Sequence, residues 1–104
     1  MKILWTDIAE QDLSEIIEYI AEDSITVAVR ILREIKNRAS ALISNPAQGR
    51  IVPELRNYNI VTYRELILTP WRIIYKLEKN AIFILCVMDS RRNIEDILLN
   101  RLLR

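Results

Sequence analysis

The 104-residue sequence contains no histidine, one cysteine and one glycine. Without histidine, and with Cys86 as the only thiol, the chain lacks a cluster of metal ligands, so we expect no metal site. A single cysteine excludes an intrachain disulfide and favours a reducing compartment. One glycine, Gly49, excludes a glycine-rich phosphate loop, and we expect it to adopt a special backbone angle. We therefore predict no cofactor.

Long apolar runs are also absent. None approaches the ~20 residues that a membrane-spanning helix needs, and Trp5 is followed at once by acidic, helix-forming residues rather than by a signal-peptide pattern. We therefore expect a cytoplasmic protein that does not bind a membrane. With three prolines and no internal repeat, the chain has little room for linkers, so residues 1–104 are predicted to form one domain. Hydrophobic residues make up 51% of it, enough for a core at this size.

The net charge of +1 hides a strong asymmetry. Through Asp23 there are seven acidic residues and one basic residue, whereas the rest of the chain has fourteen basic and seven acidic residues. Such a division is typical of a polyanion-binding surface, but it also arises when an acidic element packs against a basic one. We favour the second explanation, because two helices are predicted on either side of the division.

Apolar spacing predicts one strand and then two helices in the first half. The strand covers residues 2–5, and Thr6 or Asp7 can cap a helix that ends near Glu22. The apolar stripe of this helix consists of Ile8, Leu13, Ile16, Ile17 and Ile20. Ser24 can cap a second, longer helix that stops before Asn45–Pro46. The short connection between the helices predicts an antiparallel hairpin.

The second half is predicted to be mainly strands. Residues 51–59 are expected to be irregular because Pro53 cannot donate in a ladder. Three strands follow, at residues 61–68, 71–77 and 81–89, and a helix covers residues 93–103. The order predicts an α+β domain, with an N-terminal strand, a helical hairpin, a three-stranded antiparallel meander that completes a small sheet, and a C-terminal helix.

Arg72 lies at the centre of the most hydrophobic third of the chain. Strand alternation places it on one face with Ile74 and Lys76, opposite Trp71, Ile73 and Tyr75. Two explanations stay open. Arg72 can pair with Glu65 or Glu78 across the sheet, or it can belong to a functional site with Arg91 and Arg92, which follow the third strand.

The chain resembles the RelE/ParE-type toxins of bacterial type II toxin–antitoxin systems over roughly residues 4–92. The matching positions are Trp5, Ala9, Asp12-Leu13, Ile17, Tyr19-Ile20, Ala28, Pro46, Gly49-Arg50, Val52-Pro53-Glu54-Leu55, Tyr63-Arg64-Glu65-Leu66, Arg72-Ile73-Ile74-Tyr75, Val87 and Arg91-Arg92. The resemblance implies a toxin that is neutralised by a cognate antitoxin and that can form a toxin–antitoxin hetero-oligomer. It leaves the target open, because RelE-like members cut messenger RNA on the ribosome and ParE-like members block DNA gyrase.

The sequence lacks residues that the nuclease branch uses for proton transfer, and this favours gyrase over the ribosome as the target. For the nuclease branch, the resemblance gives Arg64, Arg72, Arg91 and Arg92 as candidate catalytic residues, and Glu65 is a conceivable base of a different kind. That branch also has a tyrosine or histidine in the tail, whereas this chain has Asn93-Ile94-Glu95-Asp96 there, and Glu65 stands where lysine is preferred. Proton-transfer groups are therefore not evident, and whether the chain is an enzyme stays open.

Three functions follow in order of preference. The first is a ParE-like toxin that binds gyrase through one cationic patch of Arg72, Arg91 and Arg92. The second is a RelE-like ribosome-dependent endonuclease, and the third is a non-toxic interaction module of the same fold. The C-terminal helix has a very wide apolar face, which we expect to bind the antitoxin. Its expected antitoxin-binding residues are Ile94, Ile97, Leu98 and Leu102.

Overall fold

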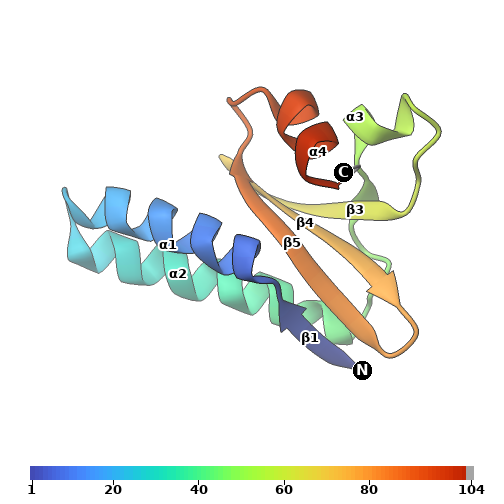
Figure 1. Cartoon of the computed structure of the whole chain (residues 1–104). Coiled ribbons are helices and arrows are strands. Elements are labelled where there is room, and N and C mark those ends of the chain that lie inside the picture. The colour runs from blue at the N-terminus through green and yellow to red at the C-terminus, as the bar shows by residue number, and fades with distance from the viewer. Residues whose placement is uncertain (103–104) are drawn as a thin grey trace.

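The computed structural model describes residues 1–102 and has one five-stranded sheet with helices on both faces (Figure 1). The elements are β1 (Lys2–Trp5), α1 (Asp7–Ala21), α2 (Ile25–Ser40), a 3-10 helix η1 (Ala41–Ile43), β2 (Arg50–Ile51), α3 (Pro53–Arg56), β3 (Tyr63–Leu68), β4 (Trp71–Glu78), β5 (Ala81–Asp89) and α4 (Ile94–Leu102). The predicted α+β class is confirmed. Residue 103, where the last helix was expected to end, lies outside the described residues.

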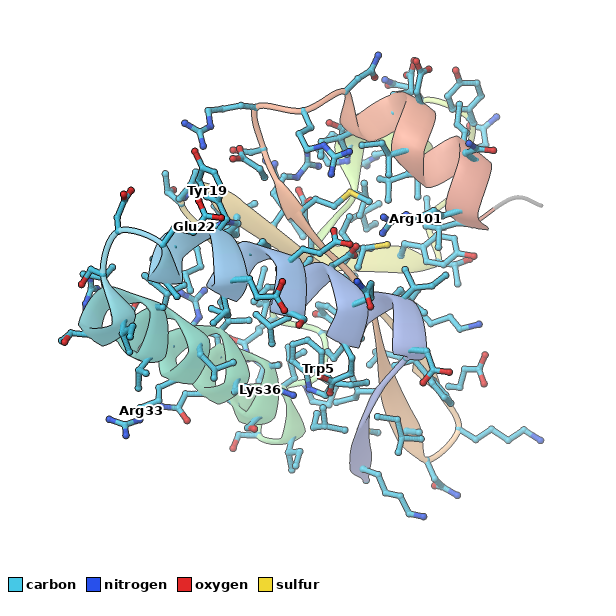
Figure 2. All side chains as sticks on the ribbon, turned by 60° about the vertical axis from the view of Figure 1, so that its left-hand side comes forward. Trp5, Tyr19, Glu22, Arg33, Lys36 and Arg101 are labelled. Atoms are coloured by element: carbon cyan, nitrogen blue, oxygen red, sulfur yellow. The ribbon has the colours of Figure 1, made fainter. Side chains whose placement is uncertain are left out.

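The helical hairpin forms as its capping residues predict. The Thr6 side chain accepts a hydrogen bond from the Ala9 amide at 3.2 Å, and Ser24 caps α2 through Val27 in the same way. One ion pair joins the acidic helix to the basic one, with Lys36 Nζ 2.9 Å from Glu10 Oε1. Lys36 also lies 4.0 Å from the centre of the Trp5 ring (Figure 2). The charge division along the sequence is therefore at least partly internal.

The sheet has the order β1-β5-β4-β3-β2. Strands β3, β4 and β5 form the predicted antiparallel meander, whereas β1 pairs with β5 in parallel. The register shifts at Ile74/Tyr75, where Cys86 and Ile84 are the successive partners on β5 and Leu85 is the extra residue. The first and last strands of the sequence are therefore neighbours in the sheet.

Each face of the sheet carries its own buried cluster. On the face under α1 and α2, the buried residues are Ala9, Leu13, Ile31, Ile35, Ala39, Leu42, Leu66, Ile73, Tyr75, Ile82, Ile84 and Val87. On the face under α3 and α4, they are Val52, Leu55, Ile74, Cys86, Met88, Ile94 and Leu98. The predicted stripe of α1 was wrong at Ile8, which is 51% exposed, while Ala9 and Asp12 are buried. Within the described residues, no helix is long and apolar enough to cross a membrane.

Residues 51–59 are more regular than predicted. They contain the end of β2 and the one-turn helix α3, with Pro53 in its first turn. Proline is well accepted there because the amide that it lacks has no partner inside the helix. The chain then turns at Asn59, whose φ is 61°. The prediction failed because Pro53 was interpreted as a strand breaker rather than as a helix start.

Gly49 is required for space rather than for its backbone angle. No glycine of the described chain has a positive φ, so the expected special angle was wrong. A Cβ at this position would lie 2.6 Å from the Glu65 carbonyl oxygen and 2.6 Å from the Tyr75 hydroxyl. That hydroxyl accepts a hydrogen bond from the Gly49 amide at 2.9 Å and donates one to the Pro46 carbonyl at 2.8 Å.

Replacing Gly49 by alanine is expected to destabilise the fold by about 1–3 kcal/mol, the usual cost of overpacking a closed site. The new methyl group must push the β2 loop away from β3 and from the Tyr75 ring. Urea unfolding measures the change, and Ala47→Ser, in the same loop, is the control that should stay near the parent. Equal stability of Gly49→Ala and the parent would show that the loop has room.

Candidate functional site

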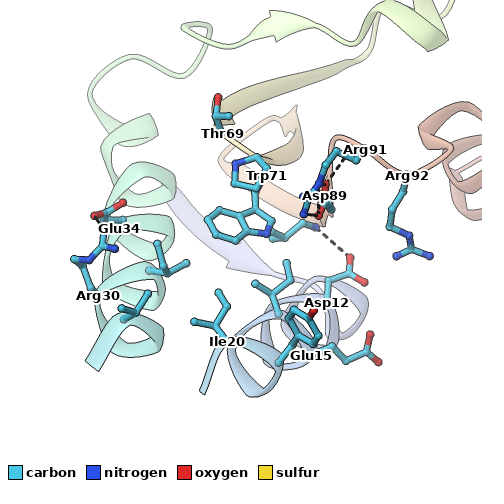
Figure 3. Close-up of a pocket in the computed structure, with 16 residues that line it drawn as sticks. Asp12, Glu15, Ile20, Arg30, Glu34, Thr69, Trp71, Asp89, Arg91 and Arg92 are labelled. Carbon is cyan, nitrogen blue, oxygen red and sulfur yellow. Dashed lines mark hydrogen bonds and ion pairs between the residues drawn. The ribbon is translucent and has the colours of Figure 1, made fainter. Parts of the chain in front are cut away.

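A groove lies between the helical hairpin and the ends of the central strands (Figure 3). We call it the hairpin groove, and its volume is about 870 Å³. It is lined by Asp12, Glu15, Ile16, Tyr19, Ile20, Val27, Arg30, Ile31, Glu34, Thr69, Pro70, Trp71, Val87, Asp89, Arg91 and Arg92. These residues come from α1, α2, the β3–β4 turn and the end of β5, so the groove exists only in the folded chain.

The walls of the groove expose apolar groups that the core does not use. Tyr19 is 74% exposed and Val27 is 37% exposed, although both belong to helices that pack on the sheet. Trp71 lies between the hairpin and the β5 end, partly buried against the core cluster (Figure 3). An aromatic pair next to aliphatic side chains is typical of a surface that binds another protein.

The turn after β5 presents two arginines at the edge of this groove. Asp89 Oδ1 accepts hydrogen bonds from both the Arg91 backbone amide and its Nε, each at 2.9 Å. The Ser90 amide donates to the Pro70 carbonyl at 2.7 Å, which ties the turn to the β3–β4 connection. The hydrogen bond from Arg91 lowers the pKa of Asp89 to about 2. Arg91 is thus held in place while its side chain stays 77% exposed.

Asp12 closes the inner side of the groove. Its Oδ2 accepts a hydrogen bond from the Val87 amide at 3.1 Å and another from Arg101 of α4 at 2.7 Å. The bond with Asp12 raises the pKa of Arg101. Burial raises the pKa of the neighbouring Cys86 thiol to about 11, so this cysteine stays protonated and unreactive at neutral pH. Asp12 therefore joins α1, β5 and α4.

Most charges around the groove are already paired. Arg30 bonds to Glu34 at 3.1 Å, and Asp89 and Asp12 hold the arginines described above. Within residues 1–102, Arg92 and Glu15 line the groove without an ion pair. Glu15 Oε1 accepts a hydrogen bond from Gln11 Nε2 at 3.0 Å. Among the described residues, the groove therefore offers an apolar surface beside one arginine and one glutamate that have no ion-pair partner.

Arg72 does not belong to this groove. Only 5% of it is exposed, and its Nε donates to Glu65 Oε1 at 2.6 Å. Its two terminal nitrogens donate to the Glu54 carboxylate at 2.7 and 2.6 Å. These bonds raise the pKa of Arg72, with Glu54 as the larger cause, and lower that of Glu54. Arg50 completes the network through Nε to Glu65 Oε2 at 2.6 Å.

The expected cationic patch of Arg72, Arg91 and Arg92 is therefore corrected. Arg72 faces α3 and is enclosed by two carboxylates, whereas the other two arginines line the groove under the hairpin. The alternative left open by the sequence, in which Arg72 pairs with Glu65 across the sheet, is confirmed, and Glu54 is an additional partner.

The Arg64 side chain contacts a different part of the molecule from the other candidate catalytic residues. Its NH1 donates to the Gly49 carbonyl at 2.7 Å and to the Ala47 carbonyl at 3.4 Å, so it fixes the β2 loop. Glu65 is 1% exposed and is bonded to two arginines. The five residues assigned to a nuclease site thus occupy three separate places in the structure.

The apolar face of α4 is mostly used by the fold itself. Ile94 is 4% exposed and Leu98 is fully buried in the cluster on this face of the sheet. Ile97 and Leu102 are partly buried against the same cluster. The premise that these four residues form an exposed surface was wrong, because the sheet covers the wide face. Binding of an antitoxin to them stays a prediction, and it requires α4 to move.

The sequence interpretation missed Glu54, Arg50 and Asp12 as interacting groups. Glu54 lies in residues 51–59, which were expected to be irregular, so it was not considered as a partner for Arg72. Asp12 did give a signal, because it occupies a position that the helical period assigns to the buried side of α1, between Ala9 and Ile16. A carboxylate at such a position indicates a buried partner.

The described residues contain no group of histidine, cysteine or acidic side chains that could hold a metal ion.

A chain described as the chromosomal ParDE TA system from P. aeruginosa has the same fold, with a TM-score of 0.70 and 22% sequence identity. The alignment covers 86% of this chain and 95% of that one. No curated protein matches the sequence. Residues 3–94 match the model of the ParE toxin of type II toxin–antitoxin system, parDE, so the chain belongs to the ParE toxin family.

Proposed function

We propose that this chain acts in the cytoplasm as the toxin of a type II toxin–antitoxin pair and arrests growth by binding DNA gyrase. The observation that carries the proposal is the hairpin groove, in which a ParE-family chain presents exposed apolar groups beside Arg91 and Arg92. A groove of this composition suits recognition of a protein surface, and no covalent step is needed to explain it.

The arrangement around Arg72 argues against the RelE-like alternative. An arginine that stabilises the transition state of RNA cleavage must direct its donors at the phosphate. Here three nitrogens of Arg72 already donate to Glu54 and Glu65. Access for a phosphate would require breaking a bidentate pair and bringing a third anion beside two carboxylates. We therefore rank ribosome-dependent cleavage below gyrase binding, and the assays described below test both.

The cognate antitoxin is proposed to occupy the same groove. Its segment needs an apolar face for Tyr19 and Trp71, an acidic group for Arg92 and a basic group for Glu15. An amphipathic helix meets these requirements with side chains on one face. Occupation would cover both arginines, which explains how an antitoxin could neutralise the toxin without altering its fold.

Purified gyrase and translating ribosomes test the proposal in parallel. We expect the protein to inhibit supercoiling of relaxed plasmid at concentrations that leave messenger RNA intact on the ribosome. Addition of the cognate antitoxin should restore supercoiling. Cleavage of ribosome-bound messenger RNA without gyrase inhibition would replace the proposal with the nuclease function. Failure of both assays, with growth arrest retained, would exclude gyrase as the target.

Removing both groove arginines is expected to relieve growth arrest without unfolding the protein. Exposed arginines contribute little to stability, and the Asp89–Ser90 turn is retained through backbone bonds. Arg91→Ala with Arg92→Ala should therefore restore colony formation on induction by at least about tenfold, if the arginines contact the target. Arg33→Ala with Arg56→Ala removes the same charge from exposed places outside the groove and should stay toxic. Equal toxicity of both double variants would show that the groove arginines are only solvated.

A further inference from the structure

The first turns of α2 leave apolar side chains exposed on the outer side of the hairpin. The end of the hairpin that carries the α1–α2 turn projects past the sheet (Figure 1). Ile25 is 72% exposed and Val29 is 38% exposed, outside the buried stripe of this helix. Both line a hollow of about 590 Å³, which we call the α2 face and which consists of Ile25, Thr26, Val29, Arg30, Arg33, Glu34 and Asn37. A partner that covered this face would remove both apolar side chains from water.

The same end of the hairpin carries charges that the fold does not pair. Arg33 points away from the rest of the chain (Figure 2), and Glu22 and Asp23 are exposed in the turn before α2. Within residues 1–102, none of these three side chains takes part in an ion pair. The division between acidic and basic parts of the sequence is therefore left uncompensated at this place.

We propose that two copies of this chain form a symmetric dimer through the α2 face, with the two α2 helices antiparallel and crossing near Val29. The two Val29 side chains then meet on the two-fold axis, and Ile25 of each copy packs on the aliphatic part of Arg33 of the other. A two-fold interface uses one surface twice, so every contact is formed twice.

Charge selects the antiparallel arrangement. Antiparallel helices centred on Val29 place Arg33 of one copy at the level of Ile25 of the other, beside the acidic turn of Glu22 and Asp23. The two Arg33 side chains are then about 12 Å apart along the axis, given a rise of about 1.5 Å per residue. That separation exceeds the screening length of ~8 Å at physiological salt. Parallel helices would instead place the two Arg33 side chains against each other.

The α2 face suits a second copy because its charges are self-complementary, with acids at one end and an arginine further along. Arg30, on the flank, is already bonded to Glu34 at 3.1 Å, so it adds no unpaired positive charge. The face is small, which is typical of a weak, concentration-dependent association. Ile25, Val29 and Arg33 do not line the hairpin groove, so the inference does not depend on the proposed function.

Sedimentation velocity of the purified full-length protein, from micromolar to millimolar concentration, measures the dimer. Arg33→Glu should weaken dimerisation by at least about tenfold, because like charges then face each other at both contacts. Glu22→Lys with Asp23→Lys should weaken it by a similar factor for the same reason. An equimolar mixture of these two variants should dimerise as the parent does, since opposite charges meet again at both contacts. Added salt should weaken the dimers of the parent and of the mixture.

Restoration by mixing separates a lost contact from a lost fold, because mixing cannot repair a variant that is unfolded. Val29→Ser should also weaken the dimer, since it removes the apolar centre of the interface. Arg56→Glu makes the same charge change as Arg33→Glu at an exposed place on α3 and should dimerise as the parent does.

Three results would each overturn the inference. They are a parent that stays monomeric throughout the concentration range, a mixture that stays monomeric, and loss of the dimer in the variant with Arg91→Ala and Arg92→Ala, which would assign it to the hairpin groove. Neither gyrase supercoiling nor growth arrest is a readout here. Failure of the dimer therefore leaves the proposed function to its own assays.

Discussion

Replacing Arg72 by alanine is expected to lower the free energy of unfolding by about 3–5 kcal/mol, the usual cost of removing one member of a buried ion pair. The variant leaves Glu65, which is 1% exposed, with Arg50 as its remaining partner. It also leaves Glu54 without the bidentate contact that holds α3 to the sheet. Urea unfolding followed by tryptophan fluorescence measures the loss.

Two further variants show whether the loss comes from this geometry. Arg72→Lys keeps the charge but cannot reproduce the bidentate pair with Glu54 together with the bond to Glu65, so we expect an intermediate loss. Arg50→Ala should cost less than either, because 58% of its side chain is exposed and solvent screens the pair. If Arg72→Ala were as stable as the parent, the network would not stabilise the fold, and a direct role of Arg72 at a target would have to be reconsidered.

The same network predicts an acid limit to stability. The hydrogen bond from Arg72 lowers the pKa of Glu54 below its ordinary value of 4.5. Its contribution is therefore fully present above the unfolded pKa and is lost as the pH falls through the lower, folded pKa. The stability that Asp89 contributes is lost in the same direction, as the pH falls, because its folded pKa is about 2. Unfolding curves of the parent and Glu54→Gln should converge in that acidic range.

Replacing Leu98 by alanine is the second large expected effect, a loss of about 2–5 kcal/mol, because the side chain is fully buried. Leu98 packs between α4 and the sheet with Ile94 and Met88. A serine at this position adds an unsatisfied hydroxyl and should cost more. Thermal and urea unfolding give both values.

This prediction changes how antitoxin binding to α4 must be tested. Weaker binding of a Leu98→Ser variant would report unfolding rather than a lost contact. Ile97→Ser is the better variant, because Ile97 is only partly buried against the cluster. If Ile97→Ser weakens the complex while the isolated toxin stays folded, α4 contributes to antitoxin binding; if the affinity is unchanged, the hairpin groove is the better candidate. A Leu98→Ala variant as stable as the parent would show that α4 is not part of the core.

Local patterns predicted most of the fold. The caps Thr6 and Ser24 and the alternation around Ile73 and Tyr75 are local features, and each was found where it was expected. The parallel pairing of β1 with β5 was not derivable in this way, because it depends on how the hairpin crosses the sheet. Helix α3 was not predicted either, because its four residues are too few to show a helical spacing of apolar side chains.

The candidate site was predicted less well, for a physical reason. A charged residue in an apolar strand indicates either a target site or a buried partner, and the choice depends on residues that are distant in sequence. Arg72 finds Glu54 eighteen positions away, and Arg101 finds Asp12 eighty-nine positions away. The hairpin groove has the same origin, because its lining residues come from four segments that are distant in sequence.

The pairing of Lys2–Trp5 with Ala81–Ile84 also has a consequence for synthesis. On the ribosome, β1 and the helical hairpin emerge long before their partner strand, and a closure over nearly eighty residues must wait for it. Until β5 is released, the hairpin has no complete surface on which to bury its apolar stripe, and the hairpin groove lacks its β5 wall. The hairpin groove is therefore complete only after most of the chain has been translated.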